Sequence, residues 1–250
     1  MTSSPIPRVL STFRQHKVRA LLMGGQACIL YGAAEFTRDV DLAVAVDSAN
    51  LKRLRKALFE LRCEAVYFPS LSAAVLRRGH ACHFRSLLPG LHGLRIDLMT
   101  KMRGVDPFNQ LWRRRQEIEL PGVGKLAVLS LPDLVKAKKT QRDKDWPMIR
   151  RLVEADIAGA SASLSLTKVA FWLRECRTYE YLREFCLRYP ALARKTAARR
   201  PALRAVIKGV RSAAAHLLRK EEDEERKRDR RYWAPLRAQL ELWRLERPRL

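Results

Sequence analysis

Apolar and polar positions follow two different patterns along the chain. In the first half, short apolar runs predict β-strands, and apolar residues three and four apart predict helices between them. The predicted strands cover residues 18–23, 39–46, 65–68, 73–76, 83–87, 94–99, 117–120 and 125–128, and the predicted helices cover residues 26–32, 50–61, 108–115, 130–139 and 147–155. This alternation is typical of an α/β or α+β domain.

The second half of the chain carries no strand pattern. A short stretch with Gly159, Ser161 and Ser163 predicts a linker, and the pattern is helical from residue 168 to the end. We therefore predict one domain over residues 1–158 and an all-helical C-terminal domain over residues 159–250. The run KEEDEERKRDRR at 220–231 places acids before bases, which predicts an exposed helix with ion pairs between positions i and i+4.

The charge of the chain narrows its partners. It has 50 Lys and Arg against 26 Asp and Glu, a formal charge of +24, which favours nucleic acid and other polyanions. Residues 160–250 hold 23 of the basic and 11 of the acidic residues, so the predicted C-terminal domain is strongly basic. The apolar runs are far shorter than the roughly 20 residues of a membrane span, so no membrane association is expected.

Two features indicate the cytoplasm. The first eight residues lack the basic segment and apolar core of a secretory signal. The cysteines are odd in number and widely spaced, which fits reduced thiols better than disulfides. They are Cys28, Cys63, Cys82, Cys176 and Cys186.

The predicted chemistry centres on three aspartates. Asp39 and Asp41 lie one residue apart in the predicted strand 39–46, so both side chains point to the same face. Two carboxylates at this spacing repel each other, and an oxygen-binding cation such as Mg²⁺ or Mn²⁺ would offset that cost. Asp97, in the apolar run 94–99, would complete a two-metal site if that strand lies beside the first.

Simpler interpretations stay open at this point. Asp39 and Asp41 are also explained as strand-edge charges paired with Arg38 and Arg95, and Asp97 as a surface residue of a half-exposed strand. A zinc site at His80, Cys82 and His83 is disfavoured because no partner pair has a suitable spacing. Those residues fit better as a strand with Cys82 turned inward.

Residues 24–42 read GGQACILYGAAEFTRDVDL, which resembles the signature of the DNA polymerase beta type nucleotidyltransferase superfamily. The closer likeness is to small bacterial AbiEii-like nucleotidyltransferases, with a Gly-Gly turn, a helix and then Arg-x-Thr-x-Asp-x-Asp. The resemblance implies an α+β nucleotidyltransferase fold, a mixed sheet with flanking helices. It matches Gly24 and Gly25 to the phosphate-binding turn, Thr37 to the Thr, and Asp39 and Asp41 to the metal ligands.

Other positions match less completely. Asp97 in RIDLMT matches the third acid of the superfamily, whereas Glu35 stands where the family has Arg. Arg38 or Lys101 would have to supply that positive charge to the nucleotide.

A later segment, LSLPDLVKAKKTQRDKDWPMI at 129–149, resembles the family's later helical motif. By that resemblance Lys138, Lys139 and Arg142 bind phosphates and Asp145 orients them. The alternative is a solvated basic helix face, with Asp145 paired to Arg142 or Lys144.

The resemblance implies a Mg²⁺-dependent transfer of a nucleotide from an NTP to an acceptor hydroxyl. The basic surface favours RNA as the acceptor, tRNA first. AbiEii-like nucleotidyltransferases are found as toxins in toxin-antitoxin systems, so the resemblance also implies a toxin-antitoxin or defence role with a cognate antitoxin. The competing hypothesis is a catalytically inactive nucleotidyltransferase fold that binds nucleic acid or a partner protein.

Overall fold

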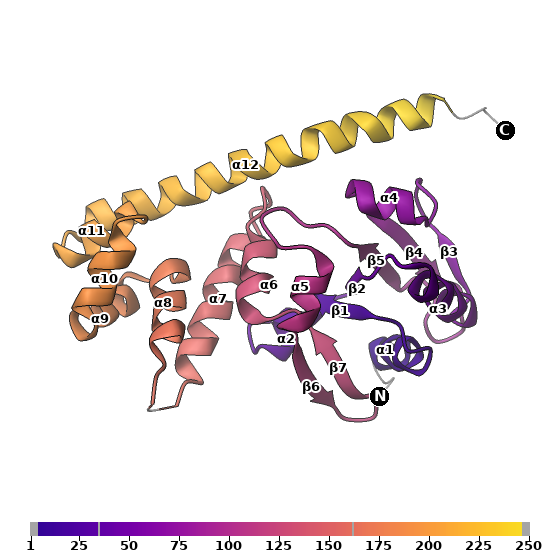
Figure 1. Cartoon of the computed structure of the whole chain (residues 1–250), viewed down its shortest axis with the longest axis horizontal. Helices are drawn as coiled ribbons and strands as arrows, with labels where there is room; N and C mark the ends of the chain where they lie inside the picture. The colour runs from indigo at the N-terminus through magenta and orange to yellow at the C-terminus, as the bar shows by residue number, and fades with distance from the viewer. Residues whose placement is uncertain (1–4, 35, 162, 247–250) are drawn as a thin grey trace. The chain divides into compact units, whose positions relative to one another are not determined.

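The chain forms two compact units in the computed structural model, which describes residues 5–34, 36–161 and 163–246 (Figure 1). The first, here called the sheet unit, comprises Met1–Leu30, Ala34–Ala137 and Tyr232–Leu250. The second, the helical unit, comprises Tyr31–Ala33 and Lys138–Arg231. The domain boundary predicted between residues 158 and 159 stays a prediction.

The sheet unit contains a mixed sheet of seven strands among the described residues, in the order β3-β4-β5-β2-β1-β7-β6. The strands are β1 Ala20–Met23, β2 Asp39–Val44, β3 Cys63–Ala65, β4 Cys82–Ser86, β5 Arg95–Met99, β6 Gln116–Leu120 and β7 Gly124–Val128. The helices that begin in this unit are α1 Ile6–Gln15, α2 Gly24–Leu30, α3 Ser48–Glu60, α4 Ala73–Arg78, α5 Phe108–Arg113 and α6 Leu131–Lys138. The predicted α+β class is confirmed.

The two faces of the sheet differ sharply in polarity. Leu42 of β2 lies opposite Leu22 of β1 and Leu98 of β5, and all three side chains are buried. One residue earlier, Asp41 lies opposite Met23 and Asp97, on the other face. The apolar face packs in the core, whereas the aspartates lie on the opposite face, where their side chains are partly exposed.

Two predicted strands differ from the structure, and one helix was missed. The strand predicted over 65–68 lies instead at Cys63–Ala65. Residues 73–76 belong to helix α4, because the Ser72 side chain accepts a hydrogen bond from the backbone N–H of Val75 and caps the helix. Helix α1 was not predicted, although Ile6, Val9, Leu10 and Phe13 have helical spacing and are buried. Helix α4 has only six residues, too few to show a helical period in the sequence, and α1 has no side-chain cap that would mark its start.

The helical unit contains no strand among its described residues. Its helices are α7 Asp145–Ala158, α8 Leu166–Glu175, α9 Tyr179–Arg188, α10 Pro190–Ala197, α11 Pro201–Ile207 and the first part of α12, Arg211–Leu245. Helix α12 passes into the sheet unit at Tyr232. Within the described part of the chain, no helix is both long enough and apolar enough to cross a membrane.

The charged run at 220–231 is helical, but its acids are not all solvated. Glu221 contacts Arg200 at 3.0 Å and Glu222 contacts Arg177 at 2.8 Å, and both arginines are almost buried. Asp229 is 2% exposed and accepts a hydrogen bond from the backbone N–H of Gln141. The predicted solvated face is therefore wrong for these acids, because buried guanidinium and amide groups need acceptors.

The pairs within this run also differ from the prediction. Lys227 with Glu224 and Arg228 with Glu225 are ion pairs three residues apart, not four.

The five cysteines are free thiols, and four of them are buried. Burial raises the pKa of Cys63 and of Cys82 to about 11. Both side chains are therefore neutral thiols near pH 7, which makes them poor nucleophiles and poor metal ligands.

Candidate active site

Three aspartates converge on the open face of the sheet. Strand β5 runs parallel to β2 with Asp97 directly opposite Asp41, and Asp39 lies two residues along the same face. One carboxylate oxygen of each residue lies within 4.8 Å of the others. The condition set from the sequence, that the strand of Asp97 lies beside that of Asp39 and Asp41, is met.

Neighbouring polar groups fix two of these carboxylates. The Thr37 hydroxyl donates to Asp39 Oδ1 at 2.6 Å. His83 Nδ1 donates to Asp97 Oδ1 at 2.8 Å, and Arg95 Nη2 donates to Asp97 Oδ2 at 3.1 Å. The side chain of Asp97 is only 12% exposed, so its orientation is well determined.

Arg95 contributes a further donor at this face. It lies opposite Asp39 in the β2–β5 register, and its ion pair is with Asp97. Its Nε is buried and has no hydrogen-bond acceptor within the described residues. A buried N–H of this kind is costly to leave unpaired, so an incoming oxygen, such as a phosphate oxygen, would satisfy it.

The Gly24–Gly25 turn lies directly against the acidic residues. A Cβ on Gly24 would be 1.8 Å from Asp41 Oδ2, and the φ of Gly24 is +65°. A Cβ on Gly25 would be 2.6 Å from the Thr37 hydroxyl. Only glycine permits this approach, and the backbone at the end of β1 therefore borders the carboxylates without any intervening side chain.

Arg38 lies directly before β2 and is exposed. Its guanidinium is over the ring of Phe36 at 5.8 Å from the centroid. Glu35, at the position where the family has Arg, lies outside the described residues. The replacement of that Arg by Arg38 or Lys101 stays a prediction.

The zinc alternative does not fit the geometry. His83 shares a face with Asp97, whereas Cys82 is 1% exposed on the opposite face, as the inward-turned reading predicted. His80 is hydrogen-bonded to Gln239 at 2.7 Å. The three residues thus have three different surroundings.

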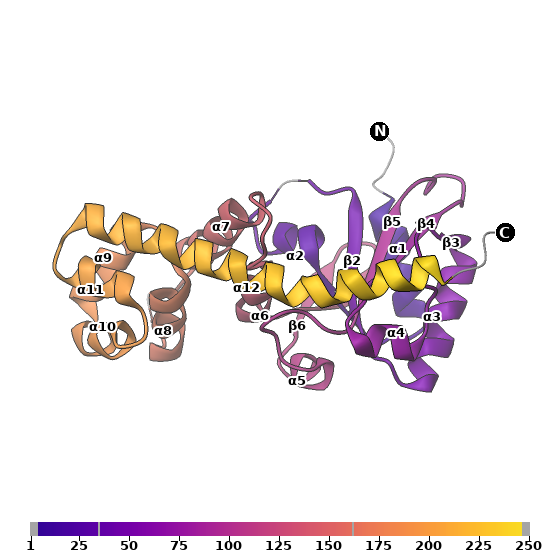
Figure 2. The ribbon, with the colours of Figure 1, turned by 90° about the horizontal axis from the view of Figure 1, so that it is seen from above.

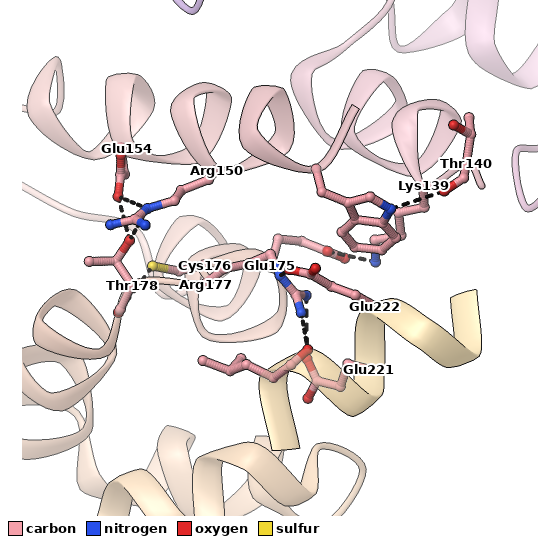
Figure 3. A network of polar contacts seen from close by, with 12 residues as sticks. Lys139, Thr140, Arg150, Glu154, Glu175, Cys176, Arg177, Thr178, Glu221 and Glu222 are labelled. Atoms are coloured by element: carbon pink, nitrogen blue, oxygen red, sulfur yellow. Dashed lines mark hydrogen bonds and ion pairs between the residues drawn. The ribbon is translucent and has the colours of Figure 1, made fainter. Parts of the chain in front are cut away.

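Lys138, Lys139 and Arg142 belong to the helical unit, where each has an acidic partner. Lys138 and Arg142 contact the buried Asp145 at 3.2 and 2.8 Å. Lys139 contacts Glu175 at 2.6 Å, a pair that Figure 3 shows within a wider network of polar contacts. The ion pair of Asp145 with Arg142 is the one expected if these residues have a structural role. The phosphate-binding role of the three bases stays a prediction.

The polar contacts in Figure 3 hold elements of the helical unit together. Arg177 donates to Glu222 at 2.8 Å, Arg150 donates to Glu154 at 2.9 Å, and Thr178 also contacts Glu154. These contacts connect α7 and the first part of α12 to the segment between α8 and α9, inside the helical unit. Every charged group among them has a partner of opposite charge, which is how buried charges are stabilised.

Asp145 provides a stability test of the helical unit. Burial alone would raise the pKa of Asp145, but Lys138, Thr140 and Arg142 outweigh it and lower the pKa below its ordinary 3.8. We expect Asp145→Asn to lower the free energy of unfolding at pH 7 by about 3 kcal/mol, because Lys138 loses its buried partner. Urea unfolding followed by circular dichroism measures this change.

The matched control is Asp143→Asn, two residues away, whose carboxylate is 97% exposed in its pair with Arg226. Its expected cost is below about 1 kcal/mol. Because folding lowers the pKa of Asp145, its contribution is complete above 3.8 and is lost as the pH falls through the lower folded value. The difference in free energy of unfolding between wild type and Asp145→Asn should therefore decrease only at acid pH. Equal stability of Asp145→Asn and Asp143→Asn at pH 7 would contradict the assignment.

His83 is the residue that the sequence did not reveal as part of the site. Its position depends on the β4–β5 register, in which His83 is the direct partner of Asp97. An alternating strand at 82–86 indicates which side chains share a face, but not which strand lies next to it.

No protein-family model and no curated protein matches this chain. Two solved structures from Helicobacter pylori superpose on most of it. One, described as "putative nucleotidyltransferase from H. pylori", has a TM-score of 0.40 and 12% identity, over 90% of this chain and 93% of that chain. The other, JHP933, has a TM-score of 0.38 and 11% identity, over 92% and 93%. The function proposed below therefore depends on the side chains of this chain.

Proposed function

We propose that this protein is a metal-dependent nucleotidyltransferase that transfers NMP from an NTP to an acceptor hydroxyl, with RNA as the favoured acceptor. The observation that carries the proposal is the convergence of Asp39, Asp41 and Asp97 on one face of two adjacent strands, with oxygens within 4.8 Å of one another. Three carboxylates gathered around a glycine turn suit a reaction on phosphates.

The donor set fits Mg²⁺ or Mn²⁺. All three side chains offer oxygen, which these hard cations prefer over nitrogen or sulfur. A cation also removes the repulsion between the clustered carboxylates. When bound, such ions would lower the pKa of the attacking hydroxyl and neutralise charge on the leaving pyrophosphate.

The residues of the chain divide the work. Asp39, oriented by Thr37, and Asp41 would hold both cations. Asp97, oriented by His83 and Arg95, would hold the cation that activates the acceptor hydroxyl and would take part in removing the hydroxyl proton. The glycine turn keeps side chains away from the triphosphate.

The bonds change in one displacement. The acceptor oxygen forms a bond to the α-phosphorus as the bond to the bridging oxygen of the β-phosphate breaks, and pyrophosphate leaves in line with the attack. The hydroxyl proton passes to Asp97 and then to solvent.

The charge of the chain supports RNA as the acceptor. A formal charge of +24 attracts polyanions from a distance and raises their local concentration. Among RNAs, tRNA is the first candidate. Phosphate binding by Arg38, Lys138, Lys139 and Arg142, and a role in a toxin-antitoxin pair, are further predictions of the resemblance.

The test is nucleotide transfer by the full-length protein. It is incubated with each α-labelled NTP, Mg²⁺ and total RNA, in parallel with an Asp39→Ala, Asp41→Ala double variant. We expect label on RNA with the wild type alone, its loss on chelation, and its return on adding Mg²⁺ or Mn²⁺. If no label reaches RNA, the protein itself or a cell extract, the competing hypothesis of an inactive binding module replaces this one.

A further inference from the structure

A cavity of about 300 Å³ lies in the sheet unit next to the carboxylates. Its lining combines aromatic rings with two arginines, and includes Tyr67, Phe68, His83, Trp233, Arg237 and Arg244. His83 belongs both to this cavity and to the active site, because its Nδ1 donates to Asp97 Oδ1 at 2.8 Å. The cavity is therefore one side chain away from the proposed metal ligands.

The C-terminal part of α12 forms one wall of the cavity and is fixed by several contacts. His80 is hydrogen-bonded to Gln239, and the ring of Trp243 lies edge-on to Phe68 at 6.0 Å. Gly79 brings the end of α4 close to the helix, since a Cβ there would be 3.4 Å from the Tyr232 hydroxyl. Figures 1 and 2 show this part of α12, in yellow, beside α4. The walls of the cavity are therefore held in place by contacts within the sheet unit.

The register places the cavity at a defined end of the site. Met23, Asp41, Asp97 and His83 are direct partners across β1, β2, β5 and β4, so they form one row across the sheet. The Gly24–Gly25 turn follows Met23 at one end of the row, and the cavity adjoins His83 at the other. In an in-line displacement the acceptor and the leaving pyrophosphate lie on opposite sides of the α-phosphorus. With the triphosphate at the glycine turn, the acceptor comes from the cavity.

The lining is suited to an unpaired nucleoside. Tyr67 is 51% exposed and lies edge-on to His83 at 5.7 Å, so its ring is accessible for stacking. Arg237 and Arg244 are exposed, and neither has an ion pair within the described residues. Aromatic rings beside cationic side chains are how proteins bind single-stranded nucleic acid. A volume near 300 Å³ is at the lower limit for ligand sites, which suits one nucleoside and excludes a duplex.

We propose that this cavity binds the terminal nucleoside of a single-stranded RNA end, the acceptor of the proposed transfer. The base stacks on Tyr67 and Trp233, Arg237 and Arg244 contact the adjoining phosphates, and the terminal hydroxyl faces Asp97. That the bound RNA end is the acceptor rests on the proposed function, but the binding of RNA in the cavity is measurable without turnover.

The binding experiment uses the full-length protein, a 5′-fluorescein single-stranded RNA and fluorescence anisotropy without added metal. We expect Tyr67→Ala and Trp233→Ala each to weaken binding about tenfold, and Tyr67→Phe to bind as the wild type does. The aromatic control is Phe59→Ala, a residue of α3 that is 86% exposed, and it should have no effect. Thermal unfolding by circular dichroism verifies that each variant is folded.

A second pair of variants tests the arginines. Arg237→Gln with Arg244→Gln removes two charges at the cavity, and Lys52→Gln with Lys56→Gln removes two charges on the exposed side of α3. The arginine pair should weaken RNA binding more and reduce its dependence on salt. Equal effects of the two pairs would show that only net charge matters and would overturn the proposal.

The last measurement locates the RNA end. A 4-thiouridine placed at the 3′ terminus should cross-link to a peptide containing Tyr67 or Trp233, and one placed in the interior should not. Cross-links elsewhere, or unchanged binding by Tyr67→Ala and Trp233→Ala, overturn the assignment.

If the wild type transfers nucleotides, Tyr67→Ala and Trp233→Ala should raise the KM for RNA and not the KM for NTP. The reverse would assign the cavity to the donor. If RNA binds in the cavity but no nucleotide is transferred, the proposed enzyme activity fails and the RNA site stands.

Discussion

Asp41→Asn is expected to lower the rate of nucleotide transfer on the order of 10³-fold while the fold and the binding of RNA are retained. Asn has almost the same shape as Asp but lacks the negative charge, and electrostatic terms of this kind carry much of enzymatic rate enhancement. Asp41 is central in the row across the sheet, with Met23 on one side and Asp97 on the other. Single-turnover transfer of α-labelled NTP to RNA measures the effect.

The control for this variant is Asp106→Asn, since Asp106 is an acid of the sheet unit that pairs with Arg114. It is 45% exposed and lies outside the aspartate cluster. The same loss of one negative charge should leave transfer unchanged there. If Asp41→Asn retains wild-type rates, the three aspartates do not carry the chemistry.

Gly24→Ala is expected to reduce transfer on the order of a hundredfold through displacement of Asp41. The added methyl group would stand 1.8 Å from Asp41 Oδ2, so the carboxylate must turn away, and misplacing a catalytic group by about 1 Å has an effect of this size. The positive φ of Gly24 adds a backbone strain of about 1–3 kcal/mol for any other residue. Transfer assays and urea unfolding measure the two consequences separately.

Gly104→Ala separates strain from the clash. Its φ is +69°, close to the +65° of Gly24, but a Cβ there has nothing within 4 Å. Both variants should therefore lose stability through the same backbone strain, Gly24→Ala should lose more because of the clash, and only Gly24→Ala should lose activity. Similar activity of both variants would show that the close approach of Gly24 to Asp41 is not required for catalysis.

The sequence could predict the site because its signals are local. Asp39 and Asp41 share a face by the two-residue period of a strand, and Asp97 interrupts an apolar run where an acid requires a reason. Register is not local, however. The pairing of Asp97 with His83 depends on which strand lies next to β5, and nothing in residues 82–86 specifies that neighbour.

The fold shows the same division. Strands β1, β2 and β5 were predicted from their apolar runs, whereas α4 was predicted as a strand because four residues carry too little periodicity to distinguish the two. The partly buried Glu221 and Glu222 were expected in solvent, since their acceptor role depends on Arg177 and Arg200, more than 20 positions away. Long-range partners of charged groups are beyond a reading of neighbouring residues.

The order of synthesis gives the last helix a particular importance. The hydrogen bond between His80 and Gln239 joins residues 159 positions apart, so a nascent chain can form most of the β-sheet long before this partner leaves the ribosome. Contacts of such separation are also formed late in folding, because closing a long loop is entropically unfavourable. The wall that α12 contributes to the cavity is thus among the last parts of the sheet unit to be completed. A chain that stopped before Tyr232 would carry all three aspartates and still lack the α12 wall of the cavity to which we assign the RNA end.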